Sequence, residues 1–415
     1  MVTVEELGRR ARAAAPALAG AGTADKNRAL LAVADALEAR EEDILAANQK
    51  DVETGQAGGM TKALLDRLTL TPARIAGMAG GVRQVVALED PIGRTDHVVR
   101  RPNGLLIGAR RVPLGVVGLI YEARPNVTVD AAVLCLKAGN AVLLRGGKEA
   151  IHTNRRLSAL MREALSACGL PADAVCFVED TARESAVGMM GLVGVLDVLI
   201  PRGGAGLIRS VVENAHVPVI ETGVGNCHAY VDAEADLEMA VRIVDNGKTS
   251  RPSVCNALET LLVACPIAPA FLPLVKRKLD EKQVELRGCP ETAAILGDAV
   301  RPADESDWGT EFSDYILAVK VVPGVREAMA HIARYGSGHS EVIITNNYFT
   351  AQRFVDRVDA AAVYVNASTR FTDGEEFGLG AEIGISTQKM HARGPMGLAA
   401  LTSIKYVVHG TGQVR

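Results

Sequence analysis

The chain has 415 residues, 48% of them apolar, so it can bury more than one core, and a prior of about 150 residues per domain suggests two or three domains. Its net charge of −4, with no basic tail or single-sign charge block, argues against a nucleic-acid or membrane-surface protein. Seven cysteines without a CxxC pair, and eight histidines that do not cluster with them, predict a reduced, cytoplasmic protein without a metal site. Charged residues interrupt the N-terminus and no apolar run reaches about 18 residues, so we expect neither a signal peptide nor a membrane span.

Apolar and charged residues alternate at helical spacing over residues 3–90, which predicts a helical layer. Residues 94–111 then form two β-prone arms about Asn103-Gly104, the strongest short hairpin signal. Because a protruding hairpin has an open edge, it either lies on its own domain or pairs subunits. We assign 94–112 as an oligomerisation hairpin.

From residue 115 onward, short apolar runs alternate with helical stretches, the pattern of a parallel sheet covered on both faces. Strands are predicted at 116–121, 141–144, 175–178, 195–200, and in a second series at 228–231, 259–264, 316–322, 341–345 and 361–365. We therefore expect an α/β fold with two Rossmann-like domains. The nucleotide-binding domain takes 1–93 and 113–225, the catalytic domain 226–365, and a glycine-rich return segment with a C-terminal oligomerisation strand near 402–408 takes 366–415.

Two of the strand ends lead into glycine-bearing turns, at 143–149 and 199–206. Glycine lets the backbone approach a phosphate, the next helix presents its N–H groups, and Arg145, Lys148 and Arg202 add charge. Each turn alone is equally well explained as an ordinary αβ connection. Two in succession favour a dinucleotide site, and the cations Arg145 and Lys148 favour NADP over NAD, unless they are solvated charges or helix partners.

Polar side chains also follow predicted strands where open α/β sheets bind ligands. Asn126 can donate to an oxyanion or act as an ordinary helix N-cap. Glu221 precedes a glycine-bearing turn and is either a base or a capping group. The sequence leaves both pairs of alternatives open.

Cys255 is the cysteine that lies among small, polar and helix-breaking residues, in the segment NGKTSRPSVCN at 246–256. A nucleophilic thiol must be accessible and needs positive or dipolar surroundings to ionise near neutral pH, which Lys248 and Arg251 could supply. Cys135 and Cys265, in contrast, lie in apolar surroundings and are predicted to be buried. Cys255 is therefore the candidate nucleophile.

Four segments carry a resemblance to a known family: VPLGVVGLIYEARPNVT at 112–128, KAGNAVLLRGGKE at 137–149, PRGGAGL at 201–207 and FTDGEEFGLGAEIGIST at 371–387. Together with the spacing of Asn126, Glu221, Cys255 and Glu311, they make the chain resemble the aldehyde dehydrogenase superfamily, most closely its acyl-phosphate-reducing branch. The resemblance runs nearly from end to end.

The resemblance implies a nucleophile at Cys255, with Asn126 and the Cys255 N–H forming the oxyanion hole. It places Glu311 on the nicotinamide ribose, Arg145 and Lys148 near the adenosine end, and Gly203 and Gly204 at the dinucleotide. Glu221 takes the position of the base that oxidative members use to hydrolyse a thioester. Candidates for holding phosphate or the substrate carboxylate are the arginines Arg124, Arg251 and Arg370.

The implied reaction is reduction of L-glutamyl 5-phosphate by NADPH to L-glutamate 5-semialdehyde and phosphate through a Cys255 thioester, the second step of proline synthesis. The implied partners are further copies of the chain, as a homodimer or homotetramer, and a separate glutamate 5-kinase. The chain departs from oxidative relatives at Pro125 and Ser313, where those relatives carry Trp and Phe. Two rival hypotheses are an oxidative dehydrogenase in which Glu221 activates water, and an inactive scaffold.

Overall fold

The computed structural model describes residues 2–122 and 124–415, and the chain divides into two compact units. Unit 1 runs to Thr222 and also takes Gly378–Gly384 and Met396–Arg415. Unit 2 comprises Gly223–Phe377 and Ile385–Pro395. The glycine-rich segment at 366–415, which the sequence-based division keeps in one piece, is thus shared between the units.

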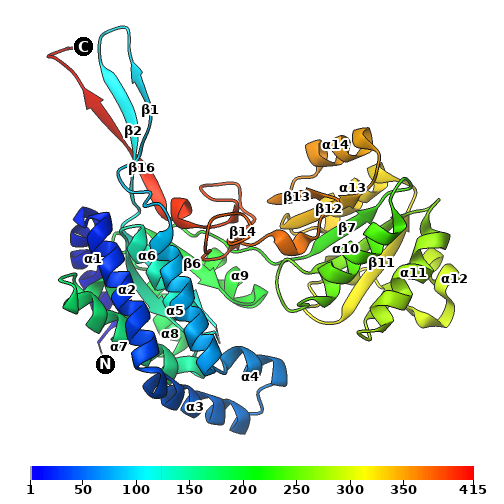
Figure 1. Cartoon of the computed structure of the whole chain (residues 1–415), viewed down its shortest axis with the longest axis horizontal. Coiled ribbons are helices and arrows are strands. Elements are labelled where there is room, and N and C mark those ends of the chain that lie inside the picture. The colour runs from blue at the N-terminus through cyan, green and yellow to red at the C-terminus, as the bar shows by residue number, and fades with distance from the viewer. Residues whose placement is uncertain (1, 123) are drawn as a thin grey trace. The chain divides into compact units, whose positions relative to one another are not determined.

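Unit 1 begins with a layer of helices, as the helical spacing predicts (Figure 1). Thr3 caps the first helix by accepting a hydrogen bond from Glu6 N, and Thr71 caps the fifth, which has Pro72 in its first turn. The helices are α1 (Val4–Gly20), α2 (Thr23–Ala39), α3 (Glu41–Ala57), α4 (Lys62–Leu68) and α5 (Pro72–Ala87).

Behind this layer lies a parallel four-stranded sheet with the strand order β5-β4-β3-β6. Its strands are β3 (Val116–Tyr121), β4 (Ala141–Arg145), β5 (Val175–Phe177) and β6 (Val198–Arg202), and the helices between and after them are α6 (Pro125–Lys137), α7 (Ile151–Ala167), α8 (Arg183–Met190) and α9 (Ala205–Asn214). Helices α1, α8 and α9 share one buried apolar cluster with the sheet. Strand β6 begins later than predicted because Val195 and Leu196 instead form turns with Leu192.

The predicted hairpin forms, and the C-terminal strand joins it as a third antiparallel strand (Figure 1). Strands β1 (Thr95–Arg100) and β2 (Leu106–Pro113) turn at Gly104, whose φ of +88° suits glycine. Strand β16 (Thr402–His409) pairs with β2 along its whole length. The three-stranded sheet of β1, β2 and β16 exposes Val98, Tyr406 and Val408, and its role in subunit pairing stays a prediction.

Unit 2 contains a parallel seven-stranded sheet with the order β10-β9-β11-β8-β7-β12-β13. The strands are β7 (Cys227–Val231), β8 (Leu258–Ala264), β9 (Glu285–Gly288), β10 (Arg301–Pro302), β11 (Ile316–Val322), β12 (Ser340–Ile344) and β13 (Ala362–Val365). The helices are α10 (Leu237–Thr249), α11 (Ala268–Asp280), α12 (Pro290–Leu296), α13 (Val325–Tyr335) and α14 (Tyr348–Arg357). The core lies between α10, α11 and the sheet, where Phe271 and Leu272 are fully buried.

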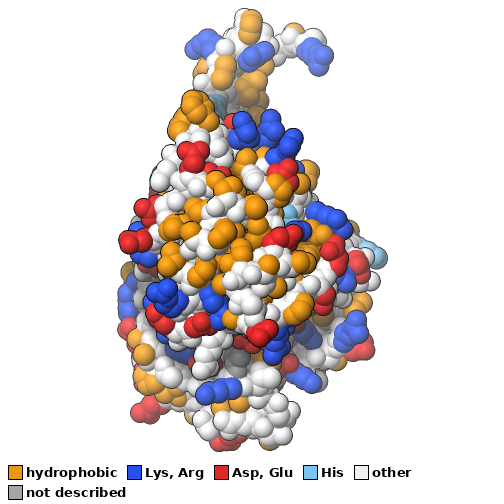
Figure 2. Space-filling view, turned by 90° about the vertical axis from the view of Figure 1, so that its right-hand side faces the viewer, with side chains coloured by type: hydrophobic (Ala, Val, Ile, Leu, Met, Phe, Trp, Pro, Cys, Tyr) orange, Lys and Arg blue, Asp and Glu red, His pale blue; other side chains and the backbone are white. Residues whose placement is uncertain are grey.

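The sequence pattern missed β9, β10 and α12, which are short and in part polar. Figure 2 shows side chains of both charges interspersed with apolar ones over the face of the molecule that it presents. Within 2–122 and 124–415, no helix is long and apolar enough to cross a membrane.

Candidate active site

Cys255 lies in a tight turn directly before β8 and is half-buried. Ala257 N donates to Val254 O at 3.0 Å and closes this turn. Gly225 packs against it so closely that a Cβ at position 225 would lie 1.6 Å from the Cys255 carbonyl oxygen. Only glycine fits there, so the backbone of Gly225 fixes the position of the candidate nucleophile.

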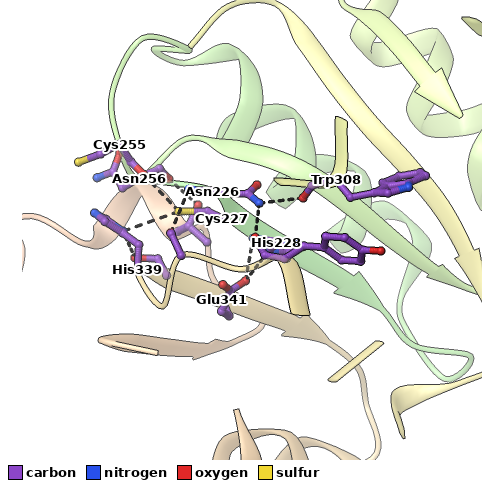
Figure 3. A network of polar contacts seen from close by, with 12 residues as sticks. Asn226, Cys227, His228, Cys255, Asn256, Trp308, His339 and Glu341 are labelled. Carbon is purple, nitrogen blue, oxygen red and sulfur yellow. Dashed lines mark hydrogen bonds and ion pairs between the residues drawn. The ribbon is translucent and has the colours of Figure 1, made fainter. Parts of the chain in front are cut away.

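A buried polar network contacts the backbone of the Cys255 turn (Figure 3). Cys227 Sγ donates to Cys255 O at 3.3 Å and lies 3.7 Å from His339 Nδ1. Burial raises the pKa of Cys227 well above its usual value, so this thiol stays neutral. In Figure 3 the Cys255 sulfur points away from Cys227, which therefore supports the backbone of the turn rather than the Cys255 thiol.

The other cysteines show that exposure alone does not identify the nucleophile. Cys135 is buried, as predicted, and burial raises the pKa of its thiol. Cys265 is exposed, so the prediction of a buried side chain is wrong; it follows the last residue of β8. What distinguishes Cys255 is its surroundings.

Asn256 joins the Cys255 turn to the segment that follows β13. Its Nδ2 donates to the carbonyls of Arg370 at 3.2 Å and Thr372 at 2.9 Å, and its own carbonyl accepts from Thr369 Oγ1 at 2.7 Å. These bonds hold the backbone of Arg370 beside the residue that follows Cys255.

Arg370 lies near the Cys255 thiol and near a second arginine, Arg251. The pKa of Arg370 is lowered, first by burial and next by the nearby charge of Arg251, while the Cys255 thiolate acts in the opposite direction. The Arg370 guanidinium contacts Asn256 Oδ1, and its Nε donates to Ser250 Oγ at 3.1 Å. Of the three arginines proposed from the sequence, Arg370 thus lies near Cys255 and also near Arg251 in unit 2. Arg124 belongs to unit 1, where it precedes α6.

Lys248 pairs with a different residue from the one predicted. Its Nζ lies 2.6 Å from Glu259 Oε2, and both side chains are fully buried. Burial lowers the pKa of Lys248 and raises the pKa of Glu259 to about 7. Lys248 therefore pairs with Glu259, and Arg370 is a cation whose charge interacts with that of Cys255.

Glu259 also anchors the turn that carries Glu311. Its second oxygen accepts from Ser313 N at 3.1 Å, and Ser313 adopts a left-handed φ of +53°. The charge of Glu311 contributes to the raised pKa of Glu259, so the two carboxylates are neighbours. The predicted ribose ligand thus extends from a turn that a buried ion pair holds.

In unit 1, Asn126 lies in the first turn of α6, after Pro125. Arg124 occupies the N-cap position, so the alternative hypothesis of Asn126 as the N-cap is wrong. The Asn126 amide instead donates from Nδ2 to Asp130 Oδ2 at 2.9 Å.

The two candidate cofactor cations at the first glycine turn have different surroundings. Arg145 donates to the carbonyls of Thr181 at 2.8 Å and Ala182 at 3.1 Å, so it holds the loop before α8. Lys148 is exposed.

Asp51 in α3 accepts from the backbone N–H of Thr153 at 2.8 Å and so caps α7. No sequence pattern predicts this cap, because 102 residues separate the two partners.

At the second turn, Gly203 and Gly204 are exposed before α9. Gly204 N donates to Glu122 Oε2 at 2.8 Å, and a Cβ on Gly203 would lie 2.5 Å from the same oxygen. Glu122 was not among the predicted residues. Glu221 is half-buried and follows Ile220, whose N–H donates to Leu199 O of β6 at 3.0 Å.

The family model of the aldehyde dehydrogenase family matches residues 2–297. The chain is 61% identical over 415 residues to the gamma-glutamyl phosphate reductase of Carboxydothermus hydrogenoformans, with 100% of both sequences covered. The enzyme of the same name from Moorella thermoacetica is 60% identical, over 99% of this chain and 98% of that protein. The chain belongs to the aldehyde dehydrogenase family. It is an oxidoreductase, as predicted.

The crystal structure of gamma-glutamyl phosphate reductase from Thermotoga maritima matches this family member with a TM-score of 0.97 and 49% identity, and both chains are covered completely. The predicted fold class and the resemblance to the acyl-phosphate-reducing branch are confirmed.

Membership of the aldehyde dehydrogenase family implies a nicotinamide cofactor. The residues of unit 1 fit a dinucleotide, because an exposed cation, Lys148, and the exposed glycine backbone at Gly203 and Gly204 each follow a strand of one sheet.

Proposed function

We propose that the chain catalyses the NADPH-dependent reduction of L-glutamyl 5-phosphate to L-glutamate 5-semialdehyde with release of phosphate, the second step of proline synthesis in the cytoplasm. The names of full-length relatives at about 60% identity support this reaction. The observation that carries it is that the Arg370 guanidinium lies within electrostatic range of both the Cys255 thiol and a second guanidinium, that of Arg251. Arginine is suited to binding phosphate, and an acyl phosphate brings a phosphate to the nucleophile.

In the proposed first step, the Cys255 thiolate attacks the acyl carbon, and the bond between that carbon and the phosphate oxygen breaks. The negative charge of the departing phosphate is complemented by Arg251 and Arg370. Phosphate is a good leaving group, so the step needs little help from a general acid. It leaves a glutamyl thioester on Cys255.

In the second step the thioester is reduced. The bound nicotinamide supplies the hydride. The Asn126 amide and the Cys255 N–H act as donors to the oxyanion that forms, and loss of one such donor typically lowers the rate about a hundredfold to a thousandfold. Collapse of this tetrahedral adduct breaks the carbon–sulfur bond, releases the aldehyde and returns the thiolate.

We propose that Lys148 recognises the 2′-phosphate of NADPH. It is the exposed cation at the first glycine turn, whereas Arg145 donates to backbone carbonyls. Gly203 and Gly204 take the dinucleotide, and Glu311 takes the nicotinamide ribose. Arg124 is left as a candidate for the substrate carboxylate.

Phosphate dependence separates this reaction from its nearest rival. In the reverse direction, the proposed enzyme converts glutamate semialdehyde and NADP⁺ to product only when inorganic phosphate is present, because phosphate must release the thioester. An oxidative dehydrogenase that uses Glu221 to activate water needs no phosphate. The proposal predicts turnover that depends on phosphate and survives in the variant Glu221→Gln; phosphate-independent turnover that Glu221→Gln abolishes would establish the rival.

A further inference from the structure

We propose that Asp130 is a positioning residue that fixes the orientation of the Asn126 amide, so that its nitrogen faces the reacting carbonyl oxygen. The inference rests on the proposed function, in which Asn126 donates to the oxyanion. It concerns a residue without a part in the chemical steps described above.

The two residues lie one turn apart on α6, at the i and i+4 positions that share a helix face. Asn126 Nδ2 and Asp130 Oδ2 are 2.9 Å apart, a good hydrogen-bond distance. Asp130 is half-buried, so this contact is less exposed to competition from water than a surface pair. Burial raises the pKa of Asp130 to about 6, whereas the hydrogen bond from Asn126 and the charge of Arg202, at the end of β6, act to lower it.

The chemistry of the two groups defines the direction of the amide. An ionised carboxylate only accepts hydrogen bonds, and a primary amide donates only from its nitrogen. The nitrogen of Asn126 must therefore face Asp130. The same nitrogen carries a second hydrogen, which is left to donate to the oxyanion. A flipped amide would present its oxygen to that negative charge, so the carboxylate excludes the unproductive orientation.

This role predicts a pH dependence of known sign. Above about pH 6, Asp130 is ionised and can accept only from nitrogen. As the pH falls through this value, the protonated carboxyl gains an O–H that can donate to the Asn126 oxygen and so tolerates the flipped amide. Among the described residues, the Asn126 amide on the same helix and the charge of Arg202 on β6 act on the Asp130 carboxyl, and arginine stays charged throughout this range.

A double-mutant cycle in the full-length enzyme tests the inference, with kcat and KM measured in the phosphate-dependent assay. Asn126→Ala should lower kcat about a hundredfold or more. Asp130→Asn keeps the shape of the side chain, but its amide can hydrogen-bond to the Asn126 amide in either orientation. This variant should therefore lower kcat about tenfold and leave both KM values unchanged. Because Asp130 acts through Asn126, the double variant should be no slower than Asn126→Ala alone. The fall in wild-type kcat near pH 6 should be absent in Asp130→Asn.

Two results would overturn the proposal. One is a double variant in which the kcat losses of the two single variants multiply, and the other is a fall of kcat near pH 6 that persists in Asp130→Asn. Asp130→Ser is a second variant in case Asp130→Asn does not fold, and the same non-multiplying pattern is required of it. A wild-type enzyme without phosphate-dependent activity would contradict the proposed function and this inference together. An active wild type with multiplying losses would contradict only the role of Asp130.

Discussion

Lys248 Nζ lies 2.6 Å from Glu259 Oε2 in the interior of unit 2, where both side chains are fully buried. The pair joins α10 to the start of strand β8, where Glu259 is the second residue and follows the Cys255 turn. Through the hydrogen bond from Ser313 N to Glu259, it also holds the Glu311 turn. One ion pair thus supports both the thiol segment and the proposed ribose ligand.

Removal of Lys248 should destabilise the fold strongly. Lys248→Met leaves the Glu259 carboxylate buried without its cation, and breaking a buried pair in this way costs about 3–5 kcal/mol of unfolding free energy. Urea denaturation measures the loss. Lys278→Met, which breaks an exposed pair with Glu281 on the protein surface, is the control and should change stability little. Equal effects of the two variants would show that the buried pair has no special role.

Gly225 should be indispensable for the position of the nucleophile. A Cβ at this residue would meet the Cys255 carbonyl oxygen at 1.6 Å, so Gly225→Ala must displace the turn. A shift of about 1 Å at a reacting group can cost about a hundredfold in kcat. Steady-state kinetics and the rate of Cys255 alkylation report the effect. Gly80→Ala in α5, where a Cβ meets nothing within 4 Å, should leave both rates unchanged, and wild-type rates in Gly225→Ala would refute the argument.

Lys148 and Arg145 should differ in their effect on cofactor choice. Lys148→Met removes a cation from the proposed 2′-phosphate site, and a hydrogen bond to a charged group contributes about 1.5–3 kcal/mol, so kcat/KM for NADPH should fall roughly tenfold to a hundredfold with little change for NADH. Arg145→Met should instead loosen the Thr181–Ala182 loop and affect both cofactors alike. The opposite pattern would assign the phosphate to Arg145.

Arg251 and Arg370 should determine the affinity for phosphate. Either arginine replaced by Gln should raise the KM for phosphate in the reverse reaction about tenfold or more, because a charge-assisted contact is lost. Arg326 on α13 is exposed, and its replacement by Gln is the matched control. An unchanged KM for phosphate in both site variants would place the phosphate elsewhere.

The sequence predicted the fold well where the apolar pattern is strong. Strand β3 occurs at the predicted residues because it has no polar side chain before its final tyrosine, and β11 because its apolar run is interrupted by Lys320 alone. Strand β9, with a glutamate and an arginine among its four residues, carries no such signal. Cys255 as the nucleophile stays a prediction from its sequence surroundings and the family pattern, and the residues that support its turn were not predicted. Lys248 was assigned to the thiol because sequence proximity does not reveal that Glu259 faces it in the core. The contact between Asn126 and Asp130 was accessible from the sequence, since i and i+4 residues of a helix share a face.

The most direct test of the account is to look for a glutamyl group on Cys255. The enzyme is mixed with L-glutamyl 5-phosphate, generated in place by a glutamate 5-kinase, in the absence of NADPH, then quenched in acid and analysed by peptide mass spectrometry. We expect one glutamyl group on the peptide that contains Cys255, lost when NADPH is added before the quench, and no label in Cys255→Ala. Turnover to the semialdehyde by Cys255→Ala, or a wild-type enzyme that turns over without ever carrying this group, would contradict the thioester mechanism.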